Sequence, residues 1–253
     1  MKHFVEPKSI VREIWGKSDT ILFIFAASAA EFSLNKAVDW LYFTGRLPSD
    51  PIGRLFSTVT YARAIVFSTE TDALRAIDSM TAIHAQVETK RQAQIPDWAY
   101  RDVLSMLIDY SIRSYELLER KLEPFEKEEI FNTFRNVGQR MKLAGLPDTF
   151  TVWRRMRKQQ LQQNLKFSVY TEDLFIQYQK HLGWFRFTLL LEAQALMAPE
   201  EVRNHLGLRK TSRMNVMISL YKATKLFRAD RLLKTLILPP RYRQQIFSLD
   251  RSA

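Results

Sequence analysis

The sequence predicts an all-α protein, a single multi-helix domain of about nine helices over residues 1–253. The chain is 46% apolar and 26% charged, which is typical of a folded globular protein with a sizeable core. Its 7 glycines and 9 prolines are too few for the many turns of a sheet protein. Apolar residues recur at helical spacing between capping signals, and no internal repeat or flexible linker divides the chain.

Capping residues locate the helices of the first half. Asp50-Pro51 is a strong start signal, because the Asp side chain can accept from free backbone amides and proline at the first helical position gives up no hydrogen bond. Ser18-Asp19 and Ser68-Thr69 are similar signals. After a short opening segment between Pro7 and Gly16, helices are predicted from residue 18 to about 43, 51 to 67, 69 to about 90, 97 to just before 124, and 126 to 143.

Further helices are predicted to begin near residues 149, 171 and 200, and a last one runs from Thr211 to about Leu238, where two prolines halt it. The helix from residue 171 has an expected break at Gly183. The longest uncharged run, Thr20–Ala30, is shorter than the roughly 20 residues a membrane-spanning helix needs and therefore predicts a buried helix. We expect no transmembrane segment, and charged residues in the first fifteen positions argue against a signal peptide, so the expected location is cytoplasmic.

Charge is unevenly distributed along the chain, whose net charge is +11. Residues 1–139 hold 17 basic and 19 acidic side chains, whereas residues 140–253 hold 21 basic and 8 acidic ones. Such asymmetry indicates either a solvated basic face or an anionic partner, such as nucleic acid, a lipid surface or a carboxylate ligand. A helix-turn-helix around Gly207 is disfavoured, because arginines (Arg203, Arg213) occupy positions where that motif packs small and apolar residues. We expect no specific nucleic-acid binding.

The sequence lacks the residues that several classes of enzyme need for catalysis. With no cysteine there is no disulfide framework, thiolate zinc site, Cys nucleophile or iron–sulfur cluster. No Glu-x-x-His pair for a di-iron bundle, Gly-x-Ser-x-Gly elbow, phosphate-binding glycine loop or His-Glu-x-x-His motif occurs. Any metal must therefore be held by His, carboxylate or a cofactor.

One histidine differs from the other three. His84 follows Met80 by one turn and Ile77 by two, so its imidazole projects from the apolar stripe of its helix. A buried imidazole needs a partner for each nitrogen. Two interpretations stay open on spacing alone: a core histidine satisfied by hydrogen bonds, or a metal or haem ligand.

The preceding helix carries Arg54 and Thr58 one turn apart on one face. Burying an arginine side chain costs free energy unless its charge is paired with an anion. Arg54 is therefore either a solvated residue at the helix start, paired with Asp50, or a cation held over a cofactor with the Thr58 hydroxyl beside it.

These residues lie within motifs that resemble a known family. The text from Asp50 to Thr58 (Asp-Pro-Ile-Gly-Arg-Leu-Phe-Ser-Thr) and the His84-Ala-Gln-Val element together are similar to the catalytic domain shared by the mycophenolate-pathway oxygenase MpaB and the latex-clearing proteins, the rubber oxygenases. Further similar segments are Trp98–Leu107, Asp109-Tyr110-Ser111 and the closing Leu238–Arg243. The sequence departs from that pattern at Ser57, where latex-clearing proteins carry a lysine, and around Ala30-Glu31, where a His-Pro pair is common.

The resemblance implies an all-α fold with a globin-like core that encloses b-type haem. His84 would be the proximal iron ligand, and Arg54 and Thr58 would lie near the haem as cofactor-binding and catalytic residues. The implied reaction is dioxygen-dependent oxidation or cleavage of an alkene in an apolar, for example isoprenoid, substrate. The competing hypothesis is a non-enzymatic helical binding protein whose basic C-terminal half contacts an anionic partner or peripherally contacts a membrane surface, with His84 merely packed. The sequence does not fix the oligomeric state.

Overall fold

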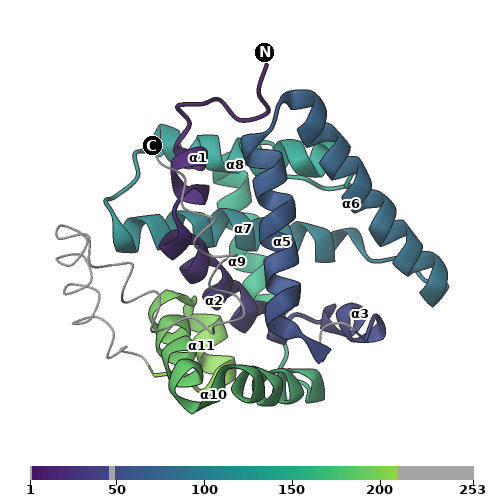
Figure 1. Cartoon of the computed structure of the whole chain (residues 1–253), viewed down its shortest axis with the longest axis vertical. Coiled ribbons are helices and arrows are strands. Elements are labelled where there is room, and N and C mark those ends of the chain that lie inside the picture. Colours follow the sequence, from purple (N-terminus) through teal and green to yellow (C-terminus); the bar gives the residue numbers. More distant parts are fainter. Residues whose placement is uncertain (1, 46–48, 210–253) are drawn as a thin grey trace.

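The computed structural model describes residues 2–45 and 49–209, and this part of the chain is built from ten α-helices (Figure 1). With the labels of Figure 1, they are α1 (Ile10–Trp15), α2 (Ser18–Leu34), α3 (Val38–Phe43), α5 (Pro51–Phe67), α6 (Glu70–Arg91), α7 (Asp97–Leu118), α8 (Pro124–Arg140), α9 (Phe150–Gln163), α10 (Val169–Met197) and α11 (Glu200–Leu206). The predicted all-α architecture is confirmed.

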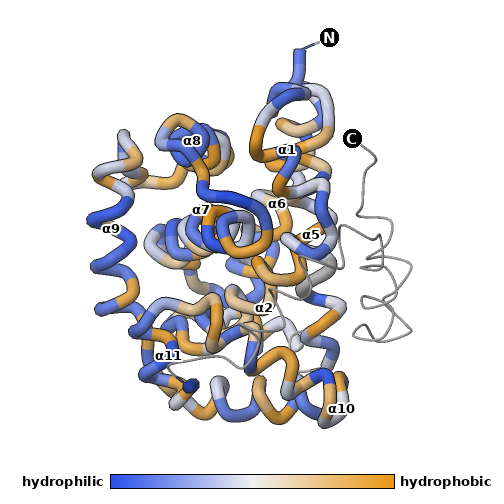
Figure 2. The backbone as a smooth tube through the Cα atoms, turned by 90° about the vertical axis from the view of Figure 1, so that its left-hand side faces the viewer, coloured by the Kyte–Doolittle hydropathy of each residue, from blue (hydrophilic) through white to orange (hydrophobic). Residues whose placement is uncertain are grey.

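Helix α2 lies at the centre of the molecule and packs against α7 along one side and α10 along another (Figures 1 and 2). Its residues are buried nearly all round, including Ile21, Ile24, Phe25 and the small Ala27. A helix that is apolar on every face is stable only when other elements cover all of them. The uncharged run that predicted a buried helix is thus the central helix of the fold.

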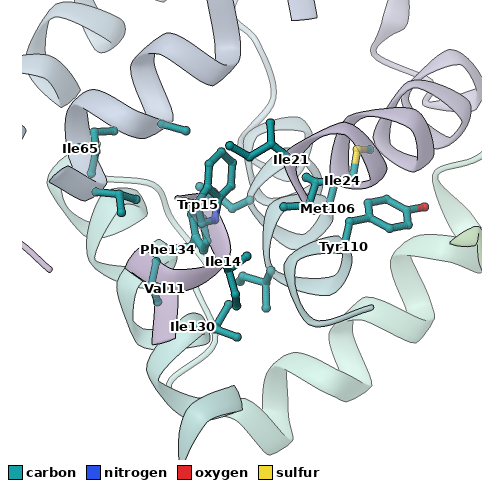
Figure 3. Packing of buried hydrophobic residues seen from close by; sticks show 14 of the residues in the cluster. Val11, Ile14, Trp15, Ile21, Ile24, Ile65, Met106, Tyr110, Ile130 and Phe134 are labelled. Atoms are coloured by element: carbon teal, nitrogen blue, oxygen red, sulfur yellow. The ribbon is translucent and has the colours of Figure 1, made fainter. Parts of the chain in front are cut away.

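The main core forms where α1, α2, α7 and α8 meet, with α5 and the first turns of α6 on its other side (Figure 3). Trp15 is fully buried there, and its ring contacts Phe25 edge-on at 6.3 Å and Phe134 at 5.9 Å between centroids. Large aromatic side chains bury the most apolar area per residue. Trp15 therefore contributes strongly to holding α1 on the domain.

A buried ionic cluster joins three helices on the other side of α2. The guanidinium of Arg157 on α9 donates to both carboxylate oxygens of Glu31 on α2 and to Asp109 on α7. Tyr110 donates to Glu31 at 2.6 Å, and Arg113 donates to Asp109 at 2.8 Å. Because every charge in this cluster has an opposite partner, burial is tolerated. The position around Ala30-Glu31, where relatives often carry His-Pro, thus has a structural role here.

A second buried carboxylate links the ends of two helices. Asp102 on α7 accepts hydrogen bonds through Oδ2 from the side-chain amides of Asn35 and Asn164, each at 2.9 Å. These two asparagines are the C-caps of α2 and α9. Burial raises the pKa of Asp102 to about 6, even though both amides oppose the shift.

Most predicted helix starts are confirmed, with one clear error. Asp50 caps α5 by accepting from the Gly53 amide, and Thr69 caps α6 by accepting from the Asp72 amide. The helix predicted from residue 18 to 43 is wrong as one unit: it ends at Leu34 because the Asn35 backbone is extended and its side chain accepts from the Ala37 amide. The break at Gly183 is confirmed, with φ 72° and ψ 165°. The helix predicted over residues 211–238 lies outside the described residues.

Within the described residues, no helix combines the length and the apolar character that are needed to cross a membrane.

Candidate functional site

Helices α5 and α6 form an antiparallel pair joined at Ser68-Thr69, and the candidate residues lie on both of them (Figure 1). Arg54 and His84 are each about four helical turns from this connection, so an antiparallel arrangement brings them to the same level. The electrostatic effect of Arg54 on His84 agrees with this placement, since the guanidinium charge lowers the pKa of the imidazole. The two residues singled out from the sequence are therefore near enough to interact electrostatically.

His84 is half-buried, and its buried Nδ1 atom makes no well-formed hydrogen bond among the described residues, although the Met80 carbonyl one turn earlier is near enough to interact with the ring. Burial lowers the pKa of His84 below its usual value, and Arg54 acts in the same direction. Glu88 and the carbonyl of Met80 oppose the shift. The net effect keeps the imidazole neutral at neutral pH, and the neutral imidazole is the form that binds metals.

Arg54 lies back along its own helix. Its Nη1 donates to Ser57 Oγ at 2.8 Å and to Thr58 Oγ1 at 3.2 Å, and the Ser57 hydroxyl in turn donates to the Arg54 carbonyl at 2.7 Å. Arg54 and Thr58 are thus joined directly, as their spacing of one turn predicted. Ser57, at the position of a lysine in latex-clearing proteins, takes part in the same cluster.

The end of α6 and the start of α7 supply two residues that sequence reasoning did not single out. The Tyr100 ring meets the His84 ring edge-on, with 5.1 Å between centroids. Glu88, one turn after His84, accepts from the Ile95 backbone amide at 2.9 Å and from the Tyr100 hydroxyl at 3.4 Å. Glu88 is near His84 because it lies one turn further along the same helix, whereas Tyr100 comes within reach because the chain reverses at Gln92, which adopts a left-handed conformation. The spacing of the residues carries no signal of that reversal.

Helix α6 is covered unevenly along its length. Ala73 and Ile77 near its start are buried, whereas Ala82, Ile83 and Ala85 around the histidine are exposed. The expectation that the whole apolar stripe enters the core is therefore correct for the first half of α6 only. At its far end Arg91 pairs with Asp39, and its guanidinium lies 4.0 Å from the Trp40 ring centroid, which ties α6 to α3.

Two cavities among the described residues lie away from the His84–Arg54 pair. A void of about 10 Å³ is lined by side chains of α7, α8 and α9, including Leu104, Phe131 and Trp153. An open groove of about 440 Å³ runs between α10 and α11. No group of three or more His, Asp or Glu side chains in the described part of the chain is arranged to hold a metal ion.

Comparison with known families decides the assignment. The family described as "ER-bound oxygenase mpaB/B'/Rubber oxygenase, catalytic domain" matches residues 17–229. The chain belongs to this family. The resemblance predicted from the sequence is thereby confirmed, and membership in an oxygenase catalytic-domain family supports an oxygenase activity. No curated protein and no solved structure matches the chain.

The matched range of the MpaB and rubber oxygenase catalytic domain includes Arg54, Thr58 and His84. Oxygenases need a metal or an organic cofactor to react with dioxygen. The residues present fit haem in two respects, namely a histidine whose pKa is lowered and whose buried Nδ1 makes no well-formed hydrogen bond, and an arginine whose charge acts on that histidine. A haem iron needs only one protein ligand, in contrast to a metal held entirely by side chains.

Proposed function

We propose that this protein is a haem-dependent oxygenase that uses b-type haem and dioxygen to oxidise or cleave an alkene in an apolar substrate, isoprenoids included. One observation carries the proposal: in a member of an oxygenase family, the buried Nδ1 of His84 has no well-formed hydrogen bond among the described residues, and the charge of Arg54 acts on the imidazole. The single domain over residues 1–253, its globin-like core and its cytoplasmic location remain predictions.

In this proposal His84 ligates the haem iron, and haem, when bound, supplies the redox chemistry with dioxygen. The depressed pKa of His84 favours ligation, because no proton has to leave the imidazole at neutral pH. Glu88 and Tyr100 position the ring of His84 from the side. A ligand held by neighbouring side chains keeps its orientation and its basicity.

Arg54 supplies permanent positive charge. Its guanidinium can pair with a haem propionate or with negative charge that develops on oxygen, because it remains protonated and presents several donors. The Ser57 and Thr58 hydroxyls fix one of its nitrogens at 2.8 Å and 3.2 Å, which holds the guanidinium in place before any ligand arrives. A charge that is already oriented stabilises a reacting group without a reorganisation cost.

The test is isotopic. Haem-loaded protein with a chemical reductant is incubated with ¹⁸O₂ and an isoprenoid alkene, squalene, and in parallel with squalane, its saturated counterpart. We expect ¹⁸O in squalene products, detected by mass spectrometry, and none in squalane. Arg54→Gln is expected to lower the rate by about tenfold or more while haem stays bound. The proposed reaction would be contradicted if the haem-loaded, reduced protein incorporated no ¹⁸O into any of a panel of isoprenoid alkenes.

A further inference from the structure

The part of α10 that precedes its kink is nearly symmetric about its own middle. A non-helical residue bounds it at each end, Ser168 with φ −140° and ψ 172° and Gly183 with φ 72° and ψ 165°. Ile176 lies at the centre of the helical residues between them. Large aromatic side chains stand just beyond both ends, at Phe167, Trp184 and Phe185. The two ends of this segment therefore carry the same kind of side chain.

One face of this segment is apolar and exposed. Its inward residues are buried against α2 and α3. On the opposite side, Val169 is 74% exposed and Ile176 is 57% exposed. The flanking aromatic residues Phe167, Trp184 and Phe185 are 51%, 75% and 50% exposed. Single exposed apolar residues are ordinary, but several large ones on one element mark an interaction surface. We call the exposed side chains of residues 167–185 the α10 surface.

The α10 surface also carries two charges of opposite sign. Glu172 precedes Ile176 by four residues and Lys180 follows it by four, so helical spacing puts all three on one face. Neither charged side chain makes a hydrogen bond or an ion pair with any described residue. They lie roughly 12 Å apart along the helix axis, which is too far for them to pair with each other. Asp173, by contrast, already accepts a hydrogen bond from Tyr42.

The order of these residues makes the segment complementary to a second copy of itself. When two identical helices pack antiparallel about a two-fold axis at Ile176, each residue faces the one that lies equally far on the other side of Ile176. Glu172 then faces Lys180 of the second copy, and Lys180 faces Glu172 of the second copy, which gives two ion pairs. Phe167 and Phe185 each lie nine positions from Ile176 and also face each other.

The α10 surface lies where a second copy can reach it. Helix α10 is at the lower end of the described part of the chain in both perpendicular views (Figures 1 and 2). An open groove of about 440 Å³ runs beside it, and Phe167 and Ile176 line that groove. The groove leaves room for side chains of the second copy, which includes the Phe185 that faces Phe167.

We propose that two copies of this chain associate through the α10 surface, with the two helices antiparallel about a two-fold axis at Ile176. Burial of the apolar side chains supplies the free energy of association, and the two ion pairs set the register. The acidic Glu172 on this face favours a second copy, which offers Lys180, over an anionic partner, which would repel it. The proposal does not depend on haem binding, because none of these residues belongs to the His84–Arg54 pair.

Sedimentation velocity of the full chain at several concentrations tests the charge pairing, in about 0.15 M salt so that distant charges are screened. We expect a reversible monomer–dimer equilibrium. Glu172→Lys and Lys180→Glu are each expected to raise the dissociation constant about tenfold or more, because each places like charges opposite one another twice. The double variant Glu172→Lys/Lys180→Glu is expected to restore the dimer. The matched control is Glu128→Lys, an exposed residue on α8 that makes the same change of charge.

Two outcomes of this experiment would overturn the proposal. One is a wild-type chain that stays monomeric, as it would if residues 210–253 of the same chain covered the α10 surface. The other is a double variant that dimerises no better than the single variants.

Cross-linking locates the two-fold axis. The chain has no cysteine, so Ile176→Cys introduces a single thiol that lies beside its own copy in the proposed dimer. Under mild oxidation we expect a disulfide-linked dimer on a non-reducing gel. Phe125→Cys, at a position that is 67% exposed on α8, is the control and is expected to stay monomeric. Cross-linking of Ile176→Cys that is no faster than that of the control would contradict the assigned axis.

Discussion

At the scale of single residues, the proposed function rests on His84, whose pKa is lowered by burial and by the charge of Arg54. A protonated imidazole would be repelled by the like charge of Arg54, so the guanidinium favours the neutral form of His84, which is the form that the proposal requires. Burial adds to that effect. The sequence left two interpretations of His84 open, a satisfied core histidine and a ligand, and the ligand role remains a proposal that the absence of a well-formed hydrogen bond at Nδ1 supports.

The electrostatic contact gives a direct prediction. Replacing Arg54 by Gln removes a positive charge near the imidazole and is expected to raise the pKa of His84, followed by NMR titration of the ring protons in the haem-free protein. Arg75→Gln is the matched control, because that arginine lies exposed on α6 and pairs with Asp72. An identical titration curve for His84 in wild type and Arg54→Gln would contradict the placement of the two residues.

At the scale of elements, capping chemistry and buried polar links decide where helices end. Asp50 occupies the space beside residue 53, so a Cβ added there would lie 2.3 Å from its Oδ2, which explains the glycine in the Asp-Pro-x-Gly-Arg element. Such local signals could be predicted from the sequence. The end of α2 at Leu34 was missed although Asn35 turns the chain locally, and the bond that anchors this turn to Asp102, 67 positions away, could not be predicted.

The link at Asp102 predicts a pH effect. Its pKa is raised from 3.8 to about 6 in the folded protein, so the stability that the protonated carboxyl provides is present below about 3.8 and is lost as the pH rises through about 6. Relative to Asp102→Asn, the wild type should lose about 2 kcal/mol of unfolding free energy between pH 4 and 7. Urea unfolding of both proteins across this range measures the difference. A constant difference would show that Asp102 titrates normally.

At the scale of the whole molecule, α2 is held centrally by apolar packing on one side and by the Glu31–Arg157–Asp109 cluster on another. The apolar side could be predicted, because an uncharged run of helical residues needs complete cover. The ionic cluster could not: Glu31 and Arg157 are 126 positions apart, and charged side chains in a sequence predict surface positions. The candidate site was predictable in the same partial way, with Arg54, Thr58 and His84 found by spacing and motif but Glu88 and Tyr100 missed.

The cluster predicts a large, specific loss of stability. Arg157→Ala leaves two buried carboxylates without their shared cation and is expected to lower the unfolding free energy by about 3–5 kcal/mol. Arg154→Ala, an exposed arginine on the same helix, is expected to change it by less than about 0.5 kcal/mol. Thermal or urea unfolding followed by circular dichroism compares them. Equal losses in the two variants would mean that the cluster contributes nothing to holding α9 on the domain.

The central claim is that His84 binds haem iron, and titration of the purified full chain with haemin, followed by the Soret band, tests it most directly. The account predicts a Soret band that saturates at one haem per chain. The band is lost in His84→Ala and returns when imidazole is added to that variant. It is unchanged in the control His205→Ala, whose histidine is exposed on α11. A wild-type protein without a Soret band, or a His84→Ala variant with the wild-type spectrum and affinity, would contradict it.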